Sequence, residues 1–192
     1  MVGIENTTNK GGGACYDIEE LQKIKQVCVD HNLKYHLDGA RLWNAMIAKK
    51  QQPKQFGELF DTISVCFSKG MGCPIGSVLL SDAETIHRAL RIRKIFGGNM
   101  RQSGYLAAAG IYALQNNINR LEEDHRRAKE LGSALQQCSW VAIVEPVETN
   151  IIVFSVQPNI KDQEVIEMLK QKGIAISLLA KGKLRIVTHL DY

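Results

Sequence analysis

A lysine and an aspartate occupy positions in this sequence that suit chemistry on a bound ligand, the lysine as an amine that can form a covalent bond. Lys69 follows the β-branched run 62–67, which is typical of a buried strand, after one intervening serine, and it precedes a turn rich in glycine. The strand fixes the lysine backbone, and the glycines let a ligand approach closely. A desolvated lysine is more readily the free amine that attacks carbonyl groups. The alternative is a lysine that extends from a strand end into solvent.

Asp38 directly follows a second short run typical of a strand, 33–37, and is itself followed by Gly39. Ligands of open α/β sheets bind at the carboxyl ends of the strands, so this acid and Lys69 could face each other across one site. The pair suits pyridoxal 5′-phosphate, because an acid keeps the pyridine nitrogen protonated while a lysine forms the Schiff base. The sequence therefore predicts this cofactor.

Five segments, in order along the chain, resemble the motifs of the L-threonine aldolases, a family of fold-type I pyridoxal-phosphate enzymes. The two strongest are HLDGARL at 36–42 and FSKGMGCPIGS at 67–77. The other three are Glu5–Thr7 before the glycines at 11–13, GGNMRQSG at 97–104, and LRIVTH at 184–189. Any one of them is a weak match, whereas five in the family's order form a specific signal.

The resemblance assigns roles to five residues. Lys69 is the Schiff-base lysine, and Asp38 is the partner of the pyridinium nitrogen. Arg41 lies beside the cofactor, Arg101 near the phosphate of a neighbouring subunit, and Arg185 on the substrate carboxylate. Without the resemblance, the three arginines have simpler interpretations: a cap on the loop, a solvated loop residue, and an outward residue of an alternating strand.

The resemblance implies a carbon–carbon lyase that cleaves L-threonine or L-allo-threonine to glycine and acetaldehyde, in threonine breakdown and glycine synthesis. It also implies a homodimer or homotetramer, since Arg101 would serve a neighbouring subunit. The base that removes the β-hydroxyl proton stays unassigned, and we interpret His36 as a structural residue. Two alternatives stay open: another fold-type I lyase or aminotransferase, and a non-catalytic chain that oligomerises.

Composition argues against several other classes of protein. A net charge of +4 over 192 residues is too small to indicate nucleic-acid binding, but it suits a pocket for anions. The five cysteines form no Cys-x-x-Cys pair and are odd in number, so we expect reduced thiols in a cytoplasmic protein. The five histidines lack zinc-ligand spacing, and no apolar run is long enough to cross a membrane.

Strand and helix patterns alternate along the chain. They predict an α/β fold in which a small α/β unit follows a larger one. The resemblance implies that the larger unit is part of a fold-type I (aspartate aminotransferase-like) large domain and that the smaller one is a small α/β domain. A helix of small apolar residues over 103–114 is expected to be buried. The other expected helices cover about 18–31, 42–50, 83–96, 120–135 and 162–172, and the expected strands cover 1–4, 33–37, 62–67, 75–80, 141–144, 151–156, 174–180 and 184–188.

We assign residues 1–118 to the large domain and 119–192 to the small one. The resemblance implies a further N-terminal segment in a full-length aldolase, with the loop that holds the cofactor phosphate and a histidine that stacks on the ring. Neither feature is identifiable in this sequence, nor is the last helix of the small domain. We interpret the chain as the central and C-terminal part of an aldolase, and expect it alone to bind the cofactor weakly or not at all.

Overall fold

The computed structural model describes residues 1–191 and shows an α/β chain of two compact units. Unit 1 contains Met1–Thr7 and Tyr16–Asn119, and unit 2 contains Thr8–Cys15 and the residues from Arg120 onward. Each unit has a four-stranded sheet of its own. The α/β class predicted from the sequence is therefore confirmed.

The sheet of unit 1 has the strand order β1-β2-β3-β4. β1 (Val2–Glu5), β2 (Tyr35–Gly39) and β3 (Thr62–Cys66) are parallel, and β4 (Ser77–Leu80) pairs antiparallel with β3. The connection that carries Lys69 therefore joins two neighbouring strands, as the sequence predicted.

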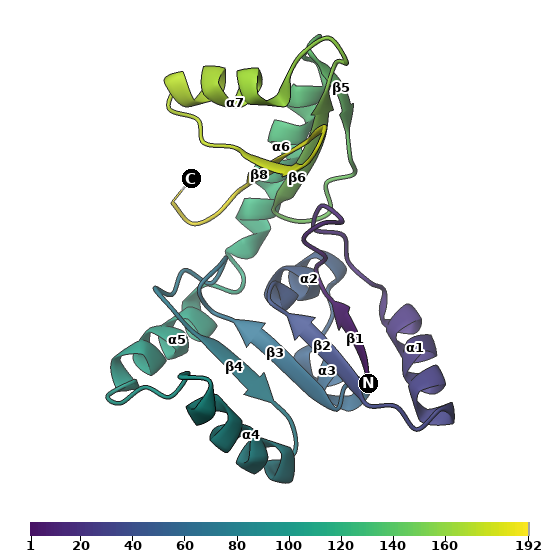
Figure 1. The fold of residues 1–192 in the computed structure, drawn as a ribbon, viewed down its shortest axis with the longest axis vertical. Helices are drawn as coiled ribbons and strands as arrows, with labels where there is room; N and C mark the ends of the chain where they lie inside the picture. The colour runs from purple at the N-terminus through teal and green to yellow at the C-terminus, as the bar shows by residue number, and fades with distance from the viewer. Residues whose placement is uncertain (192) are drawn as a thin grey trace. The chain divides into compact units, whose positions relative to one another are not determined.

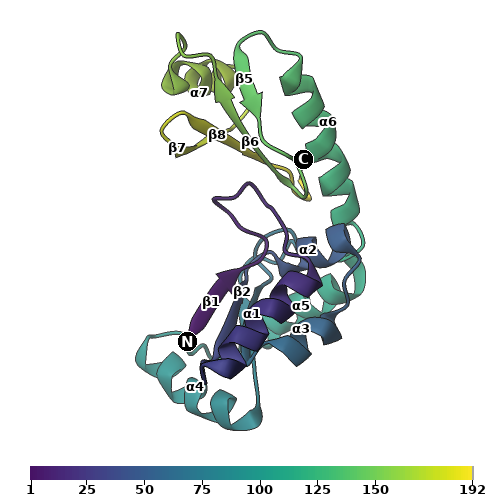
Figure 2. The same cartoon turned by 90° about the vertical axis from the view of Figure 1, so that its right-hand side faces the viewer.

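Alternation along the strands gives this sheet one apolar face and one polar face. Leu37, Ile63 and Val65 are buried on the first face, whereas the residues between them are half-buried or exposed. Figures 1 and 2 show α1 (Ile18–Asp30), α2 (Leu42–Lys49) and α3 (Pro53–Leu59) together on one side of the sheet. These helices cover the apolar face, and the opposite face carries the polar side chains.

The end of α1 decides where β2 begins. Its start follows the predicted signal, because the Asp17 N–H donates to Glu20 Oε2 at 3.1 Å. At its end, Asn32 takes a left-handed backbone (φ 51°), and the Leu33 N–H donates to the Cys28 carbonyl at 2.7 Å. Leu33 thus closes the helix, so the strand begins two residues later than predicted.

The helix α3 was not predicted, because we interpreted Pro53 as the residue that stops the preceding helix. Proline also starts helices, since its missing N–H has no partner to lose in the first turn. Here the Gln52 N–H donates to Gln55 Oε1 at 2.7 Å, and Pro53 begins the new helix. The start of α4 (Ala83–Ile95) is as predicted, with Asp82 accepting from the Thr85 N–H at 2.8 Å.

The predicted helix over 103–114 is present, but the prediction that it is buried is wrong. α5 (Gly104–Asn116) forms there, but Ala113 is its one buried residue, and Tyr105 is 88% exposed. No residue of α4 is buried, and β4 is exposed along its whole length. Within residues 1–191, no element covers these apolar side chains. We call them the apolar surface of 75–114: Ile75, Val78, Leu79, Leu80, Leu90, Ile92, Ile95, Phe96, Met100, Tyr105, Ile111, Tyr112 and Leu114.

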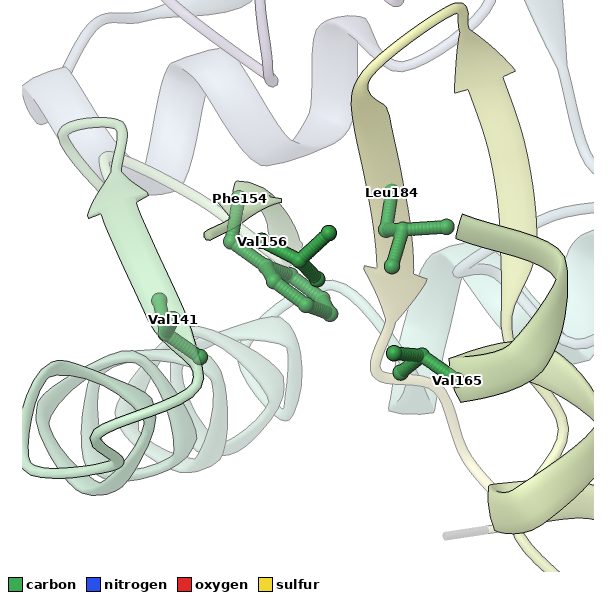
Figure 3. Packing of buried hydrophobic residues seen from close by; sticks show 5 residues of the cluster. All are labelled: Val141, Phe154, Val156, Val165 and Leu184. Carbon is green, nitrogen blue, oxygen red and sulfur yellow. The ribbon is translucent and has the colours of Figure 1, made fainter. Parts of the chain in front are cut away.

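Unit 2 contains the helices α6 (Leu121–Gln136) and α7 (Asp162–Gln171) and the strands β5 (Val141–Val144), β6 (Ile151–Val156), β7 (Ser177–Ala180) and β8 (Lys183–Val187). Its sheet is antiparallel and has the order β5-β6-β8-β7. Buried side chains from its strands and from α7 form the core in Figure 3: Val141, Phe154, Val156, Val165 and Leu184. The predicted strands 141–144 and 151–156 are confirmed, as is the hairpin around Gly182 (φ 76°).

The loop Thr8–Cys15 packs on the unit 2 sheet, which explains its triple glycine. Gly12 and Gly13 have φ of 72° and 82°, in the region that favours glycine. A Cβ on Gly13 would lie 2.4 Å from Thr149 Oγ1, which donates to the Gly13 carbonyl at 2.8 Å. Backbone conformation and close packing therefore account for these glycines without an anion. No helix among residues 1–191 is long and apolar enough to cross a membrane.

We expect the chain to self-associate through the apolar surface of 75–114, because exposed patches and an uncovered edge strand favour contacts between molecules. Replacing Ile95 and Phe96, which are 70% and 84% exposed, with glutamate should lower the weight-average mass measured by sedimentation equilibrium. Val29→Glu is the matched control, since Val29 is 60% exposed on α1, outside this surface. A parent chain that stays monomeric at tens of micromolar would contradict the prediction.

His125 should make unit 2 less stable in acid. It is 5% exposed in α6, and burial, together with the nearby Lys129 charge, lowers the pKa of His125 to about 4. The unfolded chain binds this proton near pH 6.5, so the free energy of unfolding should fall, by roughly 3 kcal/mol at most, as pH drops from about 6.5 to about 4. The free energy of unfolding, measured by urea denaturation at several pH values in this range, should depend less steeply on pH in His125→Gln than in the parent chain. Equal slopes in the two proteins would refute the assignment.

Candidate active site

The carboxyl ends of β2 and β3 bring the predicted aspartate and lysine to one face of the unit 1 sheet. Asp38 pairs with Ser64 in parallel register, so their side chains share a face, and Cys66 follows two residues further on that face. Lys69 Nζ lies 3.3 Å from Cys66 Sγ. The lysine amine therefore reaches the polar face that carries Asp38.

Backbone hydrogen bonds fix the turn that carries Lys69. The Phe67 N–H donates to the Gly76 carbonyl at 2.9 Å, and the Cys73 N–H donates to the Phe67 carbonyl at 3.1 Å. The Gly72 N–H donates to the Lys69 carbonyl at 2.9 Å, and its φ of 74° is one that glycine favours. The glycines after the lysine thus hold its backbone in one conformation.

Two helices brace this turn from the side. Trp43 Nε1 in α2 donates to the Cys66 carbonyl at 3.0 Å, and its ring lies 5.8 Å from the Phe67 ring, centre to centre. Asn117, at the end of α5, donates through Nδ2 to the Met71 carbonyl at 2.7 Å. Neither positioning residue was predicted from the sequence. The signal available for Trp43 was its place directly after the HLDGARL motif.

The Asp38 carboxylate has room to accept a further donor. Its Oδ1 accepts the Ala40 N–H at 3.0 Å, and within residues 1–191 no hydrogen bond is seen to Oδ2. The Asn6 N–H donates to the Asp38 carbonyl at 3.0 Å, which ties the end of β1 to this position. On the same face, His36 Nδ1 lies 2.7 Å from Thr62 Oγ1, and this contact supports the interpretation of His36 as structural.

Asp61 fastens β2 and β3 together at their opposite, amino ends. Its carboxylate accepts the Tyr35 N–H at 2.8 Å and ion-pairs with Lys34 at 3.0 Å and Lys25 at 3.4 Å. Burial alone would raise the pKa of Asp61, but these three donors hold it below its ordinary value. The strand pair that carries the candidate site is thus stabilised by Asp61 at its amino ends.

The three arginines occupy different elements. Arg41 is the N-cap residue of α2, directly after the Asp38 loop, and its side chain makes no capping hydrogen bond. Arg101 is exposed in the turn before α5. Arg185 lies in β8 of unit 2, where its Nη1 donates to Asn9 Oδ1 at 2.8 Å.

Arg185 is a half-buried strand residue rather than a solvated one. It pairs with Val153 of β6, and its Nε is buried without a hydrogen-bond partner among the described residues. On the same unit, a hollow of about 200 Å³ opens between the glycine loop and the sheet, and both charge signs line it, with Lys183 paired to Glu145 at 2.8 Å. Its lining includes Lys10, Gly12, Glu145, Glu148, Val153 and Lys183.

Comparison with known proteins identifies the family. The model of the beta-eliminating lyase family matches residues 1–159, which include Asp38 and Lys69. The chain belongs to the beta-eliminating lyase family. The match covers all of unit 1 and continues into the first strands of unit 2.

Curated relatives are similar over nearly the whole chain. The low specificity L-threonine aldolase of Escherichia coli (strain K12) is 39% identical over 191 residues, covering 100% of this chain and 55% of the relative. The low-specificity L-threonine aldolase 1 of Arabidopsis thaliana is 36% identical over 192 residues, covering 98% and 54%. The chain thus spans about half the length of the curated relatives it matches.

Solved structures show the same fold. A threonine aldolase from Leishmania major matches with a TM-score of 0.76 at 20% identity, over 97% of this chain and 55% of that one. Other structural neighbours include aminotransferases, whose likeness shows the fold alone. The resemblance to threonine aldolases and the fold-type I architecture, both predicted from the sequence, are confirmed.

Gly39→Ala should separate the two strands that carry the site. A Cβ at Gly39 would lie 2.6 Å from the Ser64 carbonyl oxygen and 3.1 Å from Leu42 Cβ, so the backbone beside Asp38 must shift. We expect the free energy of unfolding to fall by about 1–3 kcal/mol, measured by urea denaturation.

Gly57→Ala is the matched control for this substitution. Gly57 lies in α3, and a Cβ added there would meet nothing within 4 Å, so alanine should be neutral or stabilise by about 0.5–1 kcal/mol. A Gly39→Ala protein as stable as the parent would show that the strand ends are not closely packed.

Proposed function

We propose that the protein is a pyridoxal-phosphate enzyme that cleaves β-hydroxy-α-amino acids such as L-threonine to glycine and an aldehyde. The observation that carries the proposal is the shared face of β2 and β3, which bears Asp38 and is reached by the Lys69 amine. The similarity to low-specificity L-threonine aldolases selects this reaction among those of the family.

The residues present fit the cofactor's chemistry. Lys69 is an exposed amine on a fixed turn, and Asp38 has a carboxylate oxygen left to accept a proton donor. Within residues 1–191, the Lys69 and Asp38 side chains form no ion pair with each other. Pyridoxal phosphate, when bound, supplies an electron sink for the bond that breaks at the substrate Cα.

Each residue of the proposed site has one task. Lys69 gives the amine that attaches the cofactor, and Asp38 holds a proton at the pyridine nitrogen. Arg185 binds the substrate carboxylate, because its planar guanidinium can donate two parallel hydrogen bonds. Its hydrogen bond to Asn9 orients the side chain. Arg41 lies directly after the Asp38 loop and would stand beside the ring.

A homo-oligomer, a dimer or tetramer, completes the proposal. Arg101 would bind the phosphate group in a neighbouring copy, and it is exposed beside Met100 of the apolar surface of 75–114. An exposed apolar surface of this kind supports an interface. The proton-accepting base of the cleavage stays unassigned, and a cytoplasmic location stays a prediction from the reduced cysteines.

Borohydride trapping tests the proposed role of Lys69. The chain is mixed with pyridoxal phosphate and reduced, and the pyridoxyl group is mapped by peptide mass spectrometry. We expect Lys69 to be labelled about tenfold more than the exposed Lys54, and the preference to weaken in Asp38→Asn. Equal labelling of the two lysines in the parent chain would contradict the proposal.

Product analysis tests the reaction itself. Because we expect this chain alone to bind the cofactor weakly, pyridoxal phosphate is added in large excess. Incubation with L-threonine should then yield acetaldehyde and glycine in equal amounts, and Lys69→Ala should abolish both. Lys54→Ala is the control, since Lys54 is exposed on α3 away from the proposed site. A keto acid in place of acetaldehyde would indicate an aminotransferase, and no product beside selective trapping would indicate a chain that attaches the cofactor without catalysis.

A further inference from the structure

The thiol of Cys66 has a different neighbour from other thiols of the chain. Its Sγ lies 3.3 Å from Lys69 Nζ. The thiols of Cys73 and Cys138 instead donate to backbone carbonyls, each at 3.5 Å. Neither the family match nor the proposed reaction assigns a task to Cys66. A thiol and an amine in contact form a pair that oxidation can join.

The contact between Cys66 and Lys69 is built into the backbone. The Cys66 carbonyl accepts from Trp43 Nε1 at 3.0 Å, and Cys66 pairs with Ser77 in the sheet. The Lys69 carbonyl accepts the Gly72 N–H at 2.9 Å in the closed turn. The backbone is therefore fixed at both residues, and only the lysine side chain must be ordered for the amine to stay near the sulfur.

Both groups are accessible to a small reagent. Lys69 is exposed, and Cys66 is half-buried on the polar face of the sheet. Cys73, by contrast, is 8% exposed, and burial raises the pKa of its thiol. A hydroperoxide therefore reaches Cys66 more readily, and Cys73 serves as the internal reference.

We propose that Cys66 and Lys69 form an oxidative modification site, at which a hydroperoxide joins Sγ and Nζ by a covalent S–N bond. The thiol sulfur first takes one oxygen from the hydroperoxide and becomes a sulfenic acid, and water or an alcohol leaves. The free amine of Lys69 then attacks the sulfur. The S–O bond breaks, and the hydroxide leaves as water with a proton from the amine. The sulfur loses two electrons, and the hydroperoxide gains them.

The bond would withdraw the lysine amine from the reaction. This consequence rests on the proposed function, because it matters only if Lys69 attaches the cofactor. A thiol reductant that attacks the sulfur restores both side chains, so the modification is reversible. The site thus would make the attachment of the cofactor sensitive to peroxide.

Tryptic mapping after peroxide treatment tests the proposal without any cofactor. The chain is treated with hydrogen peroxide, blocked with N-ethylmaleimide and digested. Trypsin does not cut after a bonded Lys69, so we expect one peptide covering 55–88 with one N-ethylmaleimide group, on Cys73. Its mass should lie about 2 Da, for the two hydrogens lost, below that of the same uncut peptide with this group and no S–N bond. Dithiothreitol should restore cleavage into 55–69 and 70–88.

Variants separate this bond from other oxidation products. Cys66→Ser should abolish the joined peptide, and Cys73→Ser should keep it, which excludes a disulfide between the two cysteines. Normal cleavage after Lys69, with 55–69 heavier by about 16 or 32 Da, would overturn the proposal, since the sulfur would then be oxidised without joining the amine. The readout is a mass, so it stands or fails separately from the borohydride result.

Discussion

The parallel pairing of β2 with β3 is the constraint on which the candidate site depends. Its register sets Asp38 opposite Ser64, and the alternation of side chains then places Cys66 on the same face. A slip of one residue in this pairing would turn the acid to the apolar face. The pair is held by Asp61 at its amino ends and by the close approach of Gly39 to β3 at its carboxyl ends. The chemistry proposed for this chain therefore begins with strand register.

The rest of unit 1 serves to keep that pair and its turn in place. Helices pack on the apolar face, and Trp43 and Asn117 reach from α2 and α5 to the turn that carries the lysine. Unit 2 is stabilised differently, by a core of its own between an antiparallel sheet and two helices. The glycine loop adds to it by packing closely on the sheet and orienting Arg185 through Asn9. Its half-buried position and its bond to Asn9 thus distinguish Arg185 from the exposed Arg101.

Local signals predicted much of the fold, and tertiary contacts account for what they missed. The strands at 141–144 and 151–156 follow from apolar runs, and the cap at Asp82 follows from a short polar side chain before a helix. The start of α3 at Pro53 was not predicted, because a proline in a sequence can mark either the end of one helix or the first turn of the next. The small residues of α5 indicate close packing, but a pattern does not say which element provides it, and residues 1–191 contain none that does. For the site, the motifs gave Asp38 and Lys69, whereas the support from Trp43 and the thiol of Cys66 depends on contacts that only coordinates show.

A crystal structure of the chain after borohydride reduction with pyridoxal phosphate would show whether Asp38 and Lys69, on one face of the sheet, engage the same cofactor ring. We expect a pyridoxyl group on Lys69 whose ring nitrogen lies within about 3 Å of an Asp38 carboxylate oxygen. A ring attached to Lys69 but turned into solvent, with Asp38 unengaged, would contradict it.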